Sequence, residues 1–200
     1  MVDSVASSGV IDVRRIPLFL LEPTRSFRRH LRRVVRGSIC PLTASEHAAR
    51  VVLDESPIDG DSDTPTPNAQ GPHENDPRWP SACKCGRLFE DGDAREVTAE
   101  RVYVSTHGRV ILSEAEPGSV FDATWAKSKP EFCGKDGKSI VIVLPDLTRW
   151  WVDAKSKAGN RWTRIGIPPR LTIWPAVRSG TVHVFVAEGV IVKADPEKPG

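Results

Sequence analysis

Short apolar segments separated by turn residues fill the second half of this 200-residue chain and restrict what it can fold into. Two pairs of segments flank a turn, Thr106-His107-Gly108 in one case and Pro145-Asp146-Leu147-Thr148 in the other, which is typical of β-hairpins. The segments expected to be strands are 97–105, 109–112, 120–126, 139–144, 150–153, 171–174, 182–186 and 190–193. Strands that recur about every ten residues predict a mainly antiparallel sheet, a sandwich or a partly open barrel.

The N-terminal quarter has a different pattern. Residues 11–21 read as a strand, and Pro17 places that strand at a sheet edge because proline cannot donate to a strand ladder. Residues 25–36 are expected to form one short basic helix, because an apolar stripe repeats at helical spacing. The stripe consists of Phe27, Leu31, Val34 and Val35. Residues 48–53 predict a further strand, so the expected fold class is α+β, mainly antiparallel β.

The charges are unevenly distributed. Residues 14–50 hold nine arginines and two acids, a net charge of +7, whereas residues 51–76 hold seven acids and no lysine or arginine. One interpretation is that these faces are solvated, or that the acidic segment covers the basic helix. The other is that the basic face binds nucleic acid or another acidic surface. The candidate binding residues are Arg25, Arg28, Arg29, Arg32, Arg33 and Arg36.

Composition along the chain suggests four parts. We expect a flexible tail at 1–10, a strand-helix-strand unit at 11–53, an acidic linker rich in proline and glycine at 54–76, and a β-rich domain at 77–195. The N-terminus lacks the basic and apolar regions of a signal peptide, and the apolar run 16–21 is too short to span a membrane. We therefore expect no membrane partner and a reducing cytosol.

Cys83 and Cys85 stand one residue apart in a turn. In a reducing compartment such a pair is more often a metal or redox site than a disulfide. Gly86 is free to take the positive φ that a tight turn requires. The pair therefore predicts half of a structural zinc site, since zinc prefers four cysteine or histidine ligands.

The second half of the site is open to alternatives. Cys40 and His47 are the best candidates, because they lie in the loop between the expected helix and the strand at 48–53. The alternative is Cys133 with His107 or His73. The simpler reading is that the cysteines are small buried hydrophobic residues and that His47 is a surface histidine.

No complete catalytic set is present. The sequence contains no Gly-x-Ser-x-Gly or His-Glu-x-x-His pattern, no Walker A motif and no Rossmann glycine pattern. Asp122 and Asp153 could form a carboxylate pair, but strand-end carboxylates more often bind backbone amides. No small-molecule substrate is indicated, and a degenerate hydrolase-like domain is a minor alternative.

Several motifs resemble a family of uncharacterised proteins encoded by actinobacterial phages. The matches begin at Asn75-Asp76-Pro77-Arg78-Trp79-Pro80, followed by Cys83-Lys84-Cys85-Gly86, and continue at 117–125, where Gly-Ser-Val-Phe-Asp-Ala-Thr-Trp follows a proline. Further similar segments are Gly137-Lys138-Ser139, Trp151-Val152-Asp153 and Trp162-Thr163-Arg164. The resemblance runs from about residue 12 to residue 192. The C-terminal half is also similar to a zinc-associated domain of bacterial ubiquitin-like modification operons.

The resemblance implies a closed Cys₃His site of Cys40, His47, Cys83 and Cys85. The family's C-terminal cysteines have no counterpart here, which weakens any activity that needs a second metal or thiol centre. The expected function is a phage-encoded, zinc-stapled, non-enzymatic structural or protein-interaction protein, such as a minor virion component. Its expected location is the host cytoplasm or the virion, and its expected partners are other phage or host proteins. The alternative is a nucleic-acid-binding module that uses the arginine-rich segment.

Overall fold

The computed structural model describes residues 15–57, 72–154, 162–179 and 182–194. The chain divides into two compact units, each assembled from separate parts of the sequence. Unit 1 comprises Met1–Glu22, Ser105–Gly108 and Glu114–Gly200, and unit 2 comprises Pro23–Val104 and Arg109–Ser113. The expected tail at 1–10 and most of the expected linker lie outside the described residues. No helix of the described part has the length and hydrophobicity needed to cross a membrane.

The described residues form thirteen strands and no α-helix; the only helical segments are three short 3₁₀ turns. The strands are β1 (Ile16–Pro17), β2 (Phe19–Leu20), β3 (Glu22–Ile39), β4 (Glu46–Pro57), β5 (Ala94–Ser105), β6 (Gly108–Ile111), β7 (Ser119–Asp122), β8 (Ile140–Val143), β9 (Arg149–Trp151), β10 (Thr163–Ile167), β11 (Arg170–Ser179), β12 (Val182–Ala187) and β13 (Val190–Lys193). They form three sheets with mainly antiparallel pairing, so the mainly antiparallel β part of the predicted α+β class is confirmed and its α part is not.

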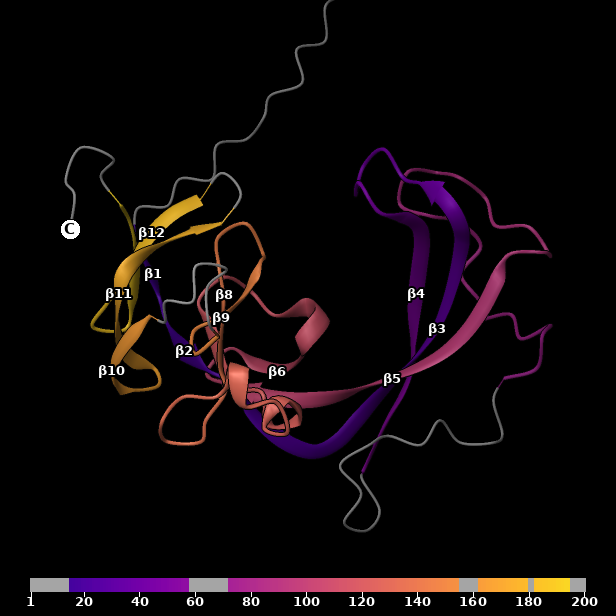
Figure 1. The fold of residues 1–200 in the computed structure, drawn as a ribbon. Helices are drawn as coiled ribbons and strands as arrows, with labels where there is room; N and C mark the ends of the chain where they lie inside the picture. The colour runs from indigo at the N-terminus through magenta and orange to yellow at the C-terminus, as the bar shows by residue number, and fades with distance from the viewer. Residues whose placement is uncertain (1–14, 58–71, 155–161, 180–181, 195–200) are drawn as a thin grey trace, which may run out of the picture. The chain divides into compact units, whose positions relative to one another are not determined.

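Unit 2 is built on one four-stranded sheet in the order β4-β3-β5-β6. β3 and β4 form a long antiparallel hairpin, which Figure 1 shows beside β5. Leu31 and Val34 of β3 are fully buried. The ladder ends at the pair Ile39↔Glu46, so the loop between the two strands projects from one end of the sheet.

The helix expected at 25–36 is wrong, because these residues belong to β3. Two register shifts in the pairing with β4 break the strict alternation of a strand. The buried positions consequently fall at 27, 30, 31, 33, 34 and 35, a spacing that imitates a helical stripe. Consecutive buried positions such as 33 to 35 show that β3 buries residues on both faces, and its β-branched Val34 and Val35 suit a strand.

Unit 1 contains the other two sheets, in the orders β1-β13-β12-β11-β10 and β2-β7-β8-β9. Among the described residues, the strand pairs of these two sheets are antiparallel except β2 with β7, which is parallel. Both sheets contribute to one apolar core, with Val120 and Ile142 from one sheet and Leu171 and Val184 from the other. Each of these side chains is fully buried.

Most of the expected strands of unit 1 are present. β8 and β9 form the hairpin predicted around Pro145-Asp146-Leu147-Thr148, and β1 lies at a sheet edge as Pro17 indicated. The strand expected at 120–126 instead ends at Asp122 and continues as a 3₁₀ turn, Thr124–Ala126. β10 was not predicted.

Candidate metal centre

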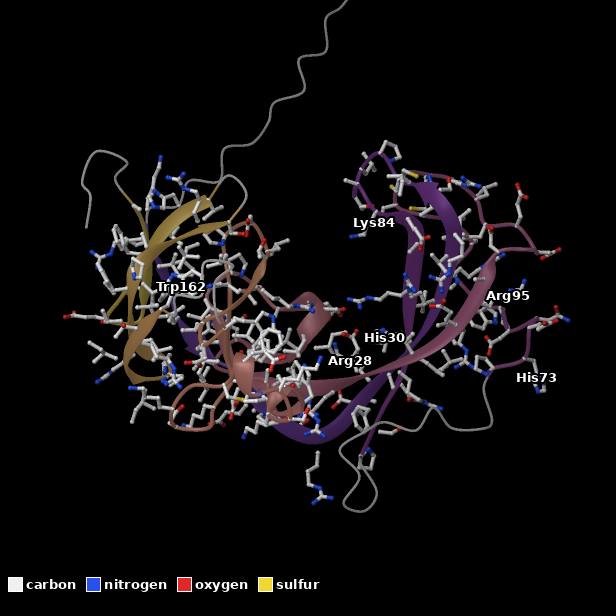
Figure 2. The ribbon with its side chains drawn as sticks, viewed as in Figure 1. Arg28, His30, His73, Lys84, Arg95 and Trp162 are labelled. Atoms are coloured by element: carbon white, nitrogen blue, oxygen red, sulfur yellow. The ribbon has the colours of Figure 1, made fainter. Side chains whose placement is uncertain are left out.

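Four potential ligands from three separate segments converge in unit 2. Cys40, His47, Cys83 and Cys85 each offer one ligand atom, and all four atoms lie within 4.8 Å of one another. The predicted set thus comes together as a group that could hold a metal ion. Figure 2 shows the sulfur atoms gathered near the labelled Lys84, beside the loop that joins β3 to β4.

The first ligand pair comes from the β3–β4 loop. The backbone amide of Cys40 donates to the carbonyl of Ser45 at 2.7 Å, and the amide of Ala44 donates to the carbonyl of Cys40 at 3.0 Å. Ala44 has a φ of 51°, a left-handed conformation that closes this turn. His47 follows as the second residue of β4 and is buried. The hairpin therefore places both side chains at the same end of the sheet.

The second pair comes from a small β-turn. The amide of Cys83 donates to the carbonyl of Arg87 at 2.8 Å, and the amide of Gly86 donates to the carbonyl of Cys83 at 2.9 Å. Gly86 has a φ of 89°, as the sequence predicted for this position. A β-bridge between Ala82 and Leu88 fixes the ends of the turn. The turn consequently places the sulfur atoms of Cys83 and Cys85 close to each other.

The spacing of two of the sulfur atoms matches one edge of a tetrahedral zinc centre. Zinc–sulfur bonds of about 2.3 Å give sulfur atoms roughly 3.8 Å apart at the corners of a tetrahedron. The sulfur atoms of Cys40 and Cys83 are 3.8 Å apart, and the Cys85 sulfur lies 3.2 Å from Nδ1 of His47. Three thiols and one imidazole form a complete ligand set, so a metal bound here keeps no open position for substrate.

The surroundings favour a thiolate at Cys40. Burial raises the pKa of this thiol, but hydrogen bonds from the side chain of Thr43 and the backbone of Leu42 outweigh it and bring the pKa to about 7. At Cys85 the backbone of Arg87 lowers the pKa, whereas burial and the two neighbouring thiols raise it, and the pKa is raised overall. The opposite shifts of Cys40 and Cys85 show that these two thiols compete for ionisation, and a bound cation would remove this conflict because metal ligands must be deprotonated.

Contacts outside the ligand set also hold the two pairs together. Cys40 and Cys83 pack with Val35 and Phe89 in a small apolar cluster. The Arg33 guanidinium lies over the Phe89 ring, 5.3 Å from its centroid, and donates to the carbonyl of Glu90. Arg33 therefore connects β3 to the segment that follows the second pair. No sequence pattern indicates this role, since arginine is usually exposed.

Arg87 forms a second such link at the rim of the site. Its guanidinium donates to the hydroxyl of Ser38 at 2.7 Å, and Ser38 lies two residues before Cys40. The Cys83 turn is thus tied to the end of β3 by a hydrogen bond that needs no metal.

The alternative ligands lie elsewhere. The Cys133 sulfur is 3.8 Å from the carbonyl of Ala126, in unit 1. The ring of His107 contacts the ring of Phe19 in a tilted arrangement, with centroids 4.3 Å apart. His73 uses its carbonyl to accept a bond from Trp79. None of the three belongs to the group of ligands that the described residues bring together, which consists of Cys40, His47, Cys83 and Cys85.

The candidate nucleic-acid residues lie on or beside a strand and are largely paired with acids. The described ion pairs are Arg28–Glu55, Arg29–Asp54, Arg32–Glu96, Arg36–Glu96 and Arg36–Glu46. Arg33 is buried, and Arg25 is exposed. The acids come from β4 and β5, so residues 54 and 55 of the acidic segment neutralise part of the basic one. This arrangement agrees with the interpretation that acids cover the arginines.

Asp122 and Asp153 bind backbone amides, as strand-end carboxylates usually do. Asp122 accepts from the amide of Ser139 at 2.9 Å, and Asp153 accepts from the amide of Ile140 at 3.2 Å.

Comparisons with protein families, with curated proteins and with solved structures find nothing that matches this chain. Function must therefore be argued from the site itself.

Proposed function

We propose that this chain is a non-enzymatic structural or protein-interaction protein in which a structural zinc ion joins the β3–β4 hairpin to the Cys83 turn. The convergence of four ligand atoms within 4.8 Å carries the proposal. Zinc suits the set best because cysteine and histidine in a tetrahedron are its usual structural ligands. A closed set stabilises a fold and leaves no position for catalysis.

The role of the metal follows from what it connects. Its ligands span the chain from Cys40 to Cys85, and residues 58–71, which lie between them in the sequence, are outside the described structure. A metal that bridges such distant segments restricts the unfolded chain and contributes its binding free energy to folding. The apolar cluster beneath it is small, so the metal supplies stability that this end of unit 2 does not obtain from a large core.

Proteolysis of the intact protein tests this role. With metal bound, the Cys83 turn should resist cleavage after Lys84 and Arg87, both of which are exposed. Treatment with a zinc chelator should accelerate cleavage at these two sites and leave cleavage after Lys193 in unit 1 unchanged. Equal cleavage rates at Lys84 and Arg87 with and without chelator would show that the metal does not hold the turn.

The place of the protein in a phage is supported by the motif resemblance alone. Mass spectrometry of purified particles of a phage that encodes this chain tests it. Peptides of the chain at a constant ratio to a capsid protein would support a minor virion component. Their absence from the particles, with the chain present in infected cells, would leave a role in the host cytoplasm.

A further inference from the structure

Unit 1 contains a cavity of about 430 Å³ that the metal centre does not involve. It lies where the loop after Cys133, the end of the β9 segment and the start of β10 meet. Its lining residues are Gly134, Lys135, Asp136, Asp153, Trp162, Thr163 and Arg164. Trp162 is labelled in Figure 2. The volume is in the usual range for small-molecule sites.

A fixed polar frame forms one side of the cavity. Arg164 donates through Nε to Asp153 at 2.8 Å and through Nη2 to Asp136 at 2.5 Å. Asp153 is buried, and its second oxygen accepts from the amide of Ile140. Because each group is held by another, the frame is preorganised and loses little entropy when it binds a ligand.

Gly134 allows the loop to approach this frame. A Cβ at this position would lie 2.6 Å from Nη2 of Arg164 and 2.6 Å from Oδ1 of Asp153. Any larger residue would therefore displace the ion pair or the loop. The close approach brings the backbone of the loop to the edge of the cavity.

The charges of the lining select the chemical class of ligand. Lys135 and Arg164 balance Asp136 and Asp153, so the lining has no net charge. An anion would face two carboxylates and a cation would face two basic groups, each at a cost. Groups that both donate and accept suit a mixed lining of this kind, and hydroxyl groups have this property.

The accessible polar groups lie at the rim. The Asp136 side chain is 45% exposed, and its ion pair with Arg164 uses Oδ1. Lys135 and Thr163 are exposed. The rim thus offers one acceptor, one ammonium donor and one hydroxyl, while the buried part of the frame holds them in place.

Trp162 supplies the apolar surface of the cavity. Its ring packs edge to face on Trp150, with centroids 5.3 Å apart and an angle of 82° between the rings, so its orientation is fixed. An indole presents apolar surface to the C–H groups of a ligand. A flat aromatic ligand could use the same surface, but it would make no hydrogen bonds to the exposed polar groups of Lys135, Asp136 and Thr163 at the rim.

We propose that this cavity binds an uncharged pyranose sugar. The C–H face of the sugar lies against Trp162, and its hydroxyl groups bond to Asp136, Lys135 and Thr163. The site is independent of the metal centre and adds carbohydrate recognition to the interaction role proposed above.

Saturation-transfer-difference NMR on the intact, metal-loaded protein tests the proposal. The probes are glucose, galactose, mannose and N-acetylglucosamine, each at about 10 mM, which detects dissociation constants in the millimolar range. We expect transfer to the ring protons of at least one sugar. Lys135→Ala and Asp136→Asn should each weaken binding about tenfold, a loss of one hydrogen bond to a charged group. Lys138→Ala is the matched control, because this lysine lies in the same loop outside the lining.

Three results would overturn the proposal. The first is no transfer from the folded wild-type protein to any of the four sugars. The second is binding that Lys135→Ala and Asp136→Asn leave unchanged, which would place the sugar elsewhere. The third is tighter binding of glucose 6-phosphate than of glucose, which would show that the lining prefers an anion. Circular dichroism of each variant separates lost binding from lost folding.

Discussion

Replacing Arg164 with methionine should destabilise unit 1 strongly, because it leaves a buried carboxylate without its cation. The Arg164 and Asp153 side chains are only 13% and 7% exposed, and their ion pair measures 2.8 Å. Removal of one member of a buried pair typically costs about 3–5 kcal/mol, against about 0–1 kcal/mol for an exposed pair. Since Asp153 keeps the amide of Ile140, we expect about 3 kcal/mol.

Urea unfolding followed by tryptophan fluorescence measures this loss. Five of the six tryptophans lie in unit 1, at 125, 150, 151, 162 and 174, so the signal reports mainly on that unit. With a urea slope of about 2 kcal/mol/M, the midpoint should fall by about 1.5 M. The double variant Arg164→Met/Asp153→Asn should recover part of the loss, because it also removes the unpaired charge. A midpoint shift below about 0.5 M for Arg164→Met would refute the reasoning.

Three further predictions concern other parts of the chain. Arg33→Met should weaken metal affinity about 10–100-fold in a competition with a chromogenic chelator, because it removes contacts that support the ligands. Arg36→Met, at an exposed position, is the control and should have little effect. Equal affinities of the two variants would exclude a positioning role for Arg33. Gly118→Ala should lower stability by about 2 kcal/mol or more, because its φ is 91° and the new Cβ would lie 2.4 Å from the Pro17 carbonyl, whereas Gly92→Ala, with open space around it, should be close to neutral in the same urea assay. The hydrogen bond from Arg29 lowers the pKa of Asp54. The stability that this pair contributes is therefore present above the ordinary carboxyl pKa of about 3.8 and is lost as the pH falls through the lower pKa of the folded state. The urea midpoint of Asp54→Asn should fall less between pH 5 and pH 3 than that of the wild type, and an equal fall would contradict the assignment.

Hairpins with short, well-marked turns could be predicted from the sequence. Pro145-Asp146-Leu147-Thr148 determines its turn locally: Leu147 has a φ of 64°, and the amide of Thr148 donates to the side chain of Asp146. Glu188 and Gly189 both have positive φ, as a tight two-residue hairpin turn requires. β8 before the first turn is a continuous buried apolar run, and β12 before the second turn alternates in burial, so both patterns predict strands.

β3 and β10 could not be predicted, for two different reasons. The arginines of β3 are neutralised by Asp54, Glu55 and Glu96, and this compensation appears only when the strands are paired. β10 exposes Ile165 and Ile167, so it lacks the buried alternation that marks a strand. Its pairing with β11 instead follows from the hairpin closed by Pro168 and Pro169.

The residue types of the metal ligands could be predicted from the sequence, but the choice of the second ligand pair could not be settled. The spacing of Cys83 and Cys85 identified one pair, whereas Cys40 and His47 competed with Cys133 on sequence grounds. The β3–β4 ladder decides between them, because it brings residues 40 and 47 to the same end of the sheet. The contribution of Arg33 depends on Phe89, 56 residues away, and no local pattern could show it.

The zinc content of the purified protein tests the central claim most directly. Protein prepared without added zinc should contain about one zinc ion per chain by native mass spectrometry and elemental analysis. Cys40→Ser and Cys85→Ser should each lose the ion, and Cys133→Ser should keep it, because this cysteine lies outside the cluster. A folded wild-type chain without zinc, or zinc that survives the loss of Cys40 and departs with Cys133, would contradict the account.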